Sequence, residues 1–101
     1  MSQAIALPFT AVEAAEIARD LPSLPLAGIS VGKTAIITEL ILEAEVAAWL
    51  RAVGIREGEQ VTVLRRAAFG GPIHLRTSSG GEFALHQSLA ASVMTRVEPP
   101  P

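Results

Sequence analysis

The sequence contains no cysteine among its 101 residues. This absence excludes a disulfide framework, a thiolate metal site and a cysteine nucleophile. Half of the residues are apolar, so a chain of this length can still bury the core of one domain. We therefore expect a single domain that folds without disulfides and is compatible with a reducing compartment.

Long apolar runs are also missing from the sequence. Apolar runs such as residues 35–37 and 40–42, which are separated by Thr38 and Glu39, fall far short of the roughly 20 residues that span a bilayer. The N-terminal segment lacks the basic region and uninterrupted apolar stretch of a signal peptide. We expect a cytoplasmic protein that is not inserted directly into a membrane.

Lysine is scarce, because Lys33 is the only one against seven arginines. Residues 1–50 hold six acidic side chains against two basic ones, whereas residues 51–101 hold six arginines against four glutamates. The planar guanidinium group suits bidentate contacts to carboxylates or phosphates better than a diffuse polycationic field. We therefore expect no nucleic-acid partner.

The periodic segments predict a mainly β chain with short helices. Residues 10–13 match a capping box and predict a short N-terminal helix. Alternation and β-branched residues predict five strands, at residues 34–42, 60–66, 73–76, 82–86 and 93–97. The i, i+3, i+4, i+7 spacing of Val46, Trp49, Leu50 and Val53 predicts an inserted helix with Trp49 on its buried face and Gly54 at its end.

These elements favour a small closed barrel. Five short strands and one inserted helix cannot cover both faces of an open sheet, and closure removes the exposed strand edges. We expect an N-terminal extension with a short helix at residues 1–25, a barrel domain at residues 26–98 and a proline tail at residues 99–101.

A series of short motifs follows the inserted helix. In order these are Val53-Gly54-Ile55, Glu57-Gly58, Val61-Thr62-Val63, Arg65-Arg66, Gly70-Gly71-Pro72 and Ala84-Leu85-His86. Together with Leu26, Gly28 and Gly32 they resemble the FeoA family of ferrous-iron transport proteins over about residues 26–97. Three of the residues, Glu57, Gly71 and His86, depart from the proline, the acid and the basic residue that the family usually has there.

The resemblance implies a fold and a role. The family's fold is a small SH3-like β-barrel, and its members assist the membrane ferrous-iron permease FeoB from the cytoplasm by contact. Similar domains form the C-terminal part of iron- and manganese-dependent repressors, but this chain lacks their upstream winged helix. The family is also described as binding transition metals.

His74 and His86 are the candidate metal ligands. Both are expected to point outward on adjacent antiparallel strands, opposite or diagonal to one another. Two imidazoles supply half of a tetrahedral shell, and the nearby carboxylates are limited to Glu82 and Glu98. The candidate cofactor is therefore a weakly bound divalent transition metal, and the alternative is that both histidines are structural or solvated.

The candidate partner-binding residues are Arg65, Arg66, Phe69 and Arg76. Alternation leaves one of the two adjacent arginines facing outward, and the resulting basic patch would dock an acidic surface of a transporter. The alternative is that Arg76 pairs with Glu82 across the hairpin and the others are solvated. Phe69, in a glycine-flanked loop, is either a partner anchor or a plug that folds back on one end of the barrel.

The functional hypothesis is a binding module. No nucleophile, base and acid occur in a recognisable arrangement, so we expect no enzymatic activity. We expect an adaptor that acts through protein-protein contact with a FeoB-type iron permease. The alternatives are a transition-metal sensor that uses His74 and His86, and a homo-oligomeric domain in which the N-terminal helix packs on a neighbouring chain.

Overall fold

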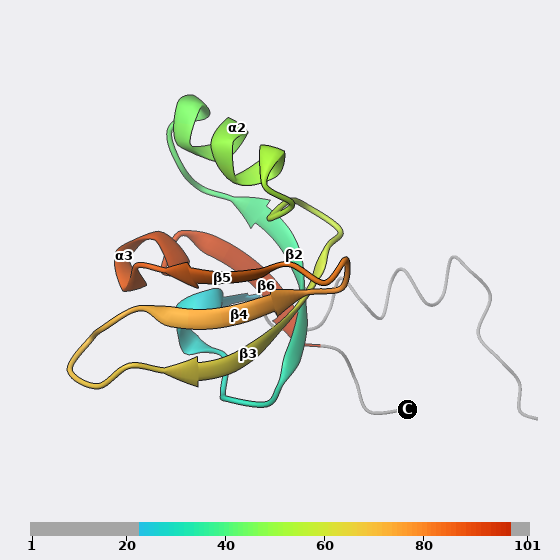
Figure 1. The fold of residues 1–101 in the computed structure, drawn as a ribbon. Coiled ribbons are helices and arrows are strands. Elements are labelled where there is room, and N and C mark those ends of the chain that lie inside the picture. Colours follow the sequence, from blue (N-terminus) through green and yellow to red (C-terminus); the bar gives the residue numbers. More distant parts are fainter. Residues whose placement is uncertain (1–22, 98–101) are drawn as a thin grey trace, which may run out of the picture.

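An antiparallel six-stranded sheet curls into a small barrel in the computed structural model, which describes residues 23–97 (Figure 1). The strand order is β1-β6-β2-β3-β4-β5. The strands are β1 (Leu24–Pro25), β2 (Thr34–Leu40), β3 (Gln60–Arg66), β4 (Ile73–Thr77), β5 (Glu82–Leu85) and β6 (Val93–Val97). The prediction of a mainly β barrel with short helices is confirmed, and β1 is a sixth strand that the sequence did not indicate. The expected N-terminal helix lies outside the described residues.

The core follows the alternation of side chains along the strands. Its fully buried members include Val61 and Val63 on β3 and Leu75 on β4. On β2 the register shifts between Ile37 and Glu39, which marks a β-bulge. Because the bulge adds one residue, Ile37 and Leu40 both face the core although they lie three positions apart.

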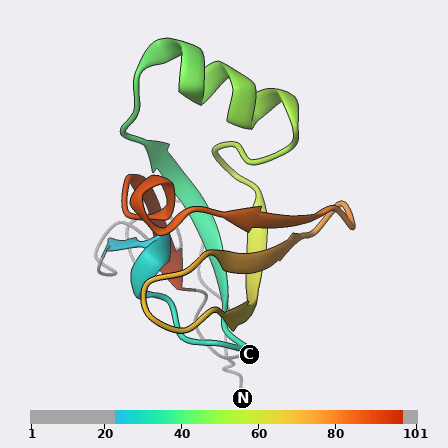
Figure 2. The same ribbon diagram turned by 60° about the vertical axis from the view of Figure 1, so that its left-hand side comes forward.

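Three short helices connect the strands: η2 (Leu26–Gly28), α2 (Ala44–Ala52) and α3 (Gln87–Ala90). The inserted helix α2 stands at one end of the barrel, away from the loop between β3 and β4 (Figures 1 and 2). As the sequence predicts, Gly54 terminates this helix: it follows the C-cap Val53 and has a φ of 102°. Hydrogen bonds from the amides of Gly54 and Ile55 to the carbonyls of Arg51 and Leu50 complete a Schellman motif.

The predicted burial of Trp49 is wrong. Its side chain is 58% exposed, whereas Ala47 and Leu50 are buried. Successive helical residues are about 100° apart, so a face centred between Ala47 and Leu50 leaves Trp49 about 130° from its middle. Ala47 and Leu50 belong to the buried core cluster, so this is the face of α2 that packs toward the barrel. The i, i+3, i+4, i+7 pattern of large apolar residues therefore predicted the wrong buried face for this helix.

Packing of helices, and not strand pairing, covers the gap between the two outer strands. Within residues 23–97 no ladder joins β5 to β1. Instead η2 contacts α3 and β6, and the buried side chains of Leu26, Ile29 and Ala90 fill this junction. The junction, which we call the seam, completes the barrel. Among the helices of residues 23–97, none has the length and apolar character needed to cross a bilayer.

Candidate interaction surface

The outer face of β3, β4 and β5 carries the predicted basic residues in cross-strand rows. Arg76 lies opposite Thr62 on one side and Glu82 on the other. The next row places His74 between Arg65 and Ala84. Side chains in one row are direct neighbours on the same face of a sheet, so Arg65 and His74 form one continuous polar surface with the Arg76 row.

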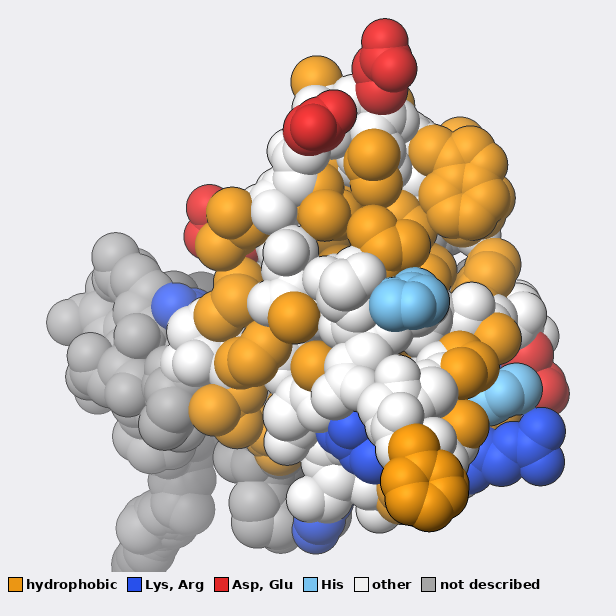
Figure 3. Space-filling view, turned by 90° about the vertical axis from the view of Figure 1, so that its left-hand side faces the viewer, with side chains coloured by type: hydrophobic (Ala, Val, Ile, Leu, Met, Phe, Trp, Pro, Cys, Tyr) orange, Lys and Arg blue, Asp and Glu red, His pale blue; other side chains and the backbone are white. Residues whose placement is uncertain are grey.

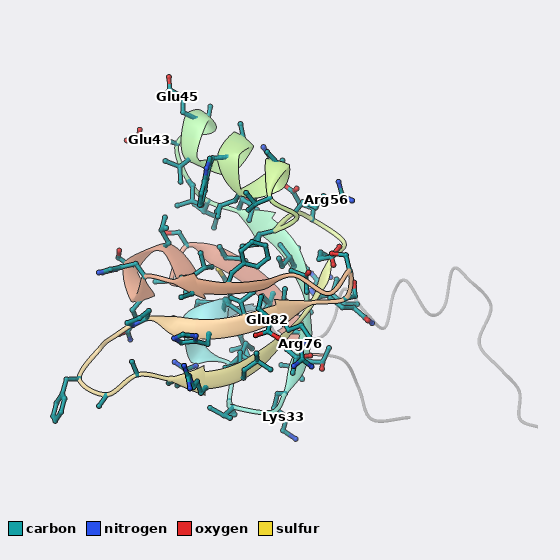
Figure 4. All side chains as sticks on the ribbon, viewed as in Figure 1. Lys33, Glu43, Glu45, Arg56, Arg76 and Glu82 are labelled. Atoms are coloured by element: carbon teal, nitrogen blue, oxygen red, sulfur yellow. The ribbon has the colours of Figure 1, made fainter. Side chains whose placement is uncertain are left out.

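Arg76 forms an ion pair with Glu82 on this face. The Nη2 and Oε2 atoms are 3.6 Å apart, and both side chains are more than half exposed (Figure 4). This pairing is the alternative that the sequence left open for Arg76. An exposed pair of this kind contributes little to stability, so Arg76 stays accessible to a partner.

A bulge on β3 at Leu64 sets the register of the two arginines that follow it, and alternation then places them on opposite faces of the strand. The register shifts between Val63 and Arg65, which leaves Arg65 opposite His74 and Arg66 opposite the buried Ile73. Arg65 is exposed, whereas Arg66 is half-buried and donates a hydrogen bond through Nη2 to the backbone carbonyl of Ile29. Of the two, Arg65 faces outward and Arg66 ties the end of β3 to the segment after η2.

Phe69 lies at the tip of the loop between β3 and β4. Its relative exposed area is 106%, so the ring does not fold back over an end of the barrel. Its φ of 57° is the only positive value of a non-glycine residue within residues 23–97. The exposed position of Phe69 therefore excludes the role of a plug and leaves that of a partner anchor.

The two histidines are placed differently from one another. His74 is half-buried on β4 opposite Ala84, whereas β5 ends at Leu85 and His86 becomes the N-cap of α3. The Nδ1 of His86 accepts a hydrogen bond from the backbone amide of Ser88 at 3.2 Å and lies 2.9 Å from its hydroxyl. The candidate metal ligands are thus not both strand residues, and capping occupies one nitrogen of His86.

No group of three or more metal-ligating side chains is found within the described part of the chain. The two histidine side chains, pale blue in Figure 3, are separated by other atoms on the surface. The residues at hand therefore offer at most two imidazoles, fewer than the three or four ligands of a typical zinc site. Metal binding by His74 and His86 stays a prediction.

Charge is distributed unevenly over the molecule. Glu43, the N-cap of α2, and Glu45 lie at one end, where Arg56 also lies, and Lys33 lies at the other end (Figure 4). In the view toward the β3-β4 loop, most of the lysine and arginine surface surrounds that loop, and two acidic side chains top the opposite end (Figure 3). The loop that carries Phe69 therefore lies on the side of the molecule where basic side chains gather.

Two glutamates have lowered pKa values because of local hydrogen bonds. The bidentate contact of Arg51 lowers the pKa of Glu57 to about 2. The hydroxyl of Ser78, 2.7 Å away, donates to Glu59 and lowers the pKa of that carboxyl. Glu59 thereby links the start of β3 to the turn between β4 and β5. Both carboxylates are engaged within the chain, so neither is a candidate ligand for a partner.

Sequence reasoning missed two features of this surface. It left open which of Arg65 and Arg66 faces outward, because the register of β3 depends on a bulge that has no reliable sequence signal. It also missed the tight turn at Phe69, although a phenylalanine followed by Gly70 and Gly71 was the available indication. Away from this surface, the exposed Trp49 on α2 is an apolar side chain that the periodicity assigned to the core.

Comparison with known proteins adds a family and a fold. The model of the FeoA domain matches residues 24–97. None of the curated proteins compared with the chain matches it. A solved iron uptake regulatory protein (FeoA) is 27% identical, with a TM-score of 0.67 over 77% of this chain and 100% of that one.

Two further solved structures share the fold. The FeoA protein from Chlorobium tepidum is 22% identical, with a TM-score of 0.70 over 75% of this chain and 71% of that chain. A manganese-dependent transcriptional repressor, in complex with manganese, is 23% identical, with a TM-score of 0.68. That match covers 76% of this chain and 37% of the repressor, so this barrel corresponds to one part of the larger protein.

Proposed function

This chain belongs to the FeoA family, which is associated with ferrous iron transport, and from this premise we propose that it is a non-enzymatic adaptor on the cytoplasmic side of a FeoB-type iron permease. The adaptor acts by protein-protein contact through the outer face of β3, β4 and β5. We call this face, defined by Arg65, Phe69, His74 and Arg76, the basic face.

The observation that carries the proposal is the accessibility of the basic face. Arg65 and Arg76 are exposed on adjacent strands of the sheet, and the fully exposed Phe69 lies in the loop that follows β3. Guanidinium groups on a fixed scaffold favour planar contacts with carboxylates. Electrostatic complementarity of this kind mainly sets association rate and specificity. The basic face therefore fits an acidic surface on the permease.

The proposal is tested by charge reversal on the basic face. The double variant Arg65→Glu/Arg76→Glu should weaken binding to the purified cytoplasmic domain of the permease by at least about tenfold, which isothermal titration measures. Arg56→Glu is the matched control, since Arg56 is exposed near the end of α2 and away from the basic face (Figure 4). Unchanged binding by the double variant would reject the proposal.

A further inference from the structure

We propose that the turn at residues 68–71 is a rigid mount that presents Phe69 as a single aromatic anchor for an apolar pocket, rimmed by carboxylates, on a protein partner. The inference rests on the proposed function for the identity of that partner. It goes further in assigning the main contact to one ring and in stating the shape and chemistry of the surface that receives it.

The turn has a defined and unfavourable geometry for phenylalanine. The amide of Gly71 donates to the carbonyl of Ala68 at 3.2 Å, which closes a four-residue turn. Its two central residues, Phe69 and Gly70, have φ values of 57° and 74°. Positive φ at both positions defines a type I′ turn, which favours asparagine, aspartate or glycine. A bulky side chain in this region is strained.

Exposure of the ring adds a second unfavourable feature. At 106% relative exposure the ring gains no burial from its own barrel. Strained and solvent-exposed aromatic residues lower stability without a structural return, and backbone outliers of this kind are concentrated at ligand-binding sites. Phe69 therefore lowers the stability of the isolated barrel, and only a contact with another molecule would compensate for this loss.

The mount is held in place by its neighbours. The amide of Ala67 donates to the carbonyl of Pro72 at 3.1 Å, directly below the turn. Gly71 packs so closely that a Cβ there would lie 2.6 Å from the Cβ of Ala67. At Gly70 a Cβ would lie 3.1 Å from the amide oxygen of Gln87 in α3. A loop fixed in this way loses little conformational entropy when it binds.

The surroundings of the turn define the chemistry of the partner. The exposed Arg65 precedes the loop, and most of the lysine and arginine surface in this view lies around it (Figure 3). An acidic rim on the partner complements these cations, and a dry pocket accepts the ring as a central anchor. Membrane binding instead scales with a broad apolar area, and one ring supplies little. The observations thus favour a protein pocket over a lipid surface.

Replacing the ring tests the proposal, because the replacement should separate binding from stability. Phe69→Asn places a residue that type I′ turns favour at this position, so the melting temperature should stay unchanged or rise. Binding to the purified cytoplasmic domain of the permease should fall by roughly 30-fold, as expected for an anchor residue. Phe69→Tyr should retain most of the binding. Trp49→Gln is the control for loss of an exposed aromatic elsewhere.

The outcomes distinguish this inference from the proposed function. Full binding by Phe69→Asn together with lost binding by Arg65→Glu/Arg76→Glu would overturn the anchor and leave the adaptor intact. A fall in melting temperature for Phe69→Asn would show that the ring stabilises the fold, and would also overturn it. If the wild type binds phosphatidylglycerol vesicles through Phe69, or binds neither probe, the protein pocket is rejected.

Discussion

At the scale of single residues, the carboxylate of Glu57 holds the end of α2 against the following turn. The Nε and Nη2 atoms of Arg51 donate to its two oxygens at 3.0 and 2.7 Å. This bidentate bond lowers the pKa of Glu57 from its ordinary 4.5 to about 2. Glu57 is thus protonated near pH 4.5 in the unfolded chain but only at a much lower pH in the folded protein.

The pH dependence of unfolding follows from this shift. The stabilisation by Glu57 should be complete above pH 4.5 and should disappear as the pH falls toward about 2. Urea unfolding should therefore show wild type more stable than Glu57→Gln at neutral pH, with a margin that shrinks over this window. The margin should be small, because both side chains are exposed and water screens them. The stability of Arg51→Gln should depend on pH as weakly as that of Glu57→Gln. A difference between wild type and Glu57→Gln that does not change with pH would contradict the lowered pKa of Glu57.

Leu50 and Trp49 provide a second test at the residue scale. Leu50 is fully buried and Trp49 is 58% exposed, although they are neighbours on one helix. Leu50→Ala should lower the free energy of unfolding by about 2–5 kcal/mol, because it leaves a cavity in the core. Trp49→Ala should cost about 1 kcal/mol or less. Urea titration followed by circular dichroism measures both, and equal losses would show that Trp49 also packs in the core.

At the scale of elements, the loop between β3 and β4 depends on a glycine. A Cβ at Gly71 would lie 2.6 Å from the Cβ of Ala67 and 3.2 Å from the carbonyl oxygen of Ala68, so the backbone must shift to admit it. Gly71→Ala should destabilise the protein by about 1–3 kcal/mol. Gly28→Ala in η2 is the matched control, since a Cβ there meets only Pro25 at 3.8 Å. Thermal unfolding of both variants measures the difference, and equal melting temperatures would contradict the close packing.

The strands were predictable from the sequence because alternation is a local property. The central strands β3 and β4 end within one residue of their predicted bounds. What could not be predicted depends on contacts between distant segments. The bulges at Thr38 and Leu64 arise from pairing with β6 and β4, and strand β1 exists only because β6 lies beside it. Sequence periodicity contains no information about such partners.

The candidate site was predictable in its residue types and not in its arrangement. Alternation indicated that one of the adjacent arginines faces outward, and Arg65 does so. That Arg66 instead bonds to the carbonyl of Ile29 follows from a long-range approach that no motif marks. His86 became a helix cap because β5 ended one residue earlier than predicted. Small shifts in element ends therefore changed the roles of side chains that the pattern had grouped together.

At the scale of the whole molecule, the exposed Arg65 and Arg76 lie together on the basic face, whereas Glu43 and Glu45 lie at the α2 end, where Arg56 also lies (Figure 4). This separation should orient the protein as it approaches an acidic partner. Raising the salt concentration from about 0.1 to about 1 M shortens the Debye length from about 10 to about 3 Å. The association rate with the permease domain should then fall, as stopped-flow mixing measures. Arg65→Glu/Arg76→Glu should show a weaker salt dependence, and identical slopes would exclude steering by the basic face.

The seam between β5 and β1 also determines where the barrel is least cooperative. Strands β2, β3, β4 and β6 each lie between two hydrogen-bonded neighbours, whereas β5 and β1 each have one. Within residues 23–97 no ladder joins these two strands, and side-chain packing that includes Leu26, Ile29 and Ala90 holds the two ends together. Transient opening should begin there, so β5 amides lacking a strand partner should exchange with deuterium sooner than those of β2. The barrel is thus a ring of strands that is closed by contact between two short helices, η2 and α3.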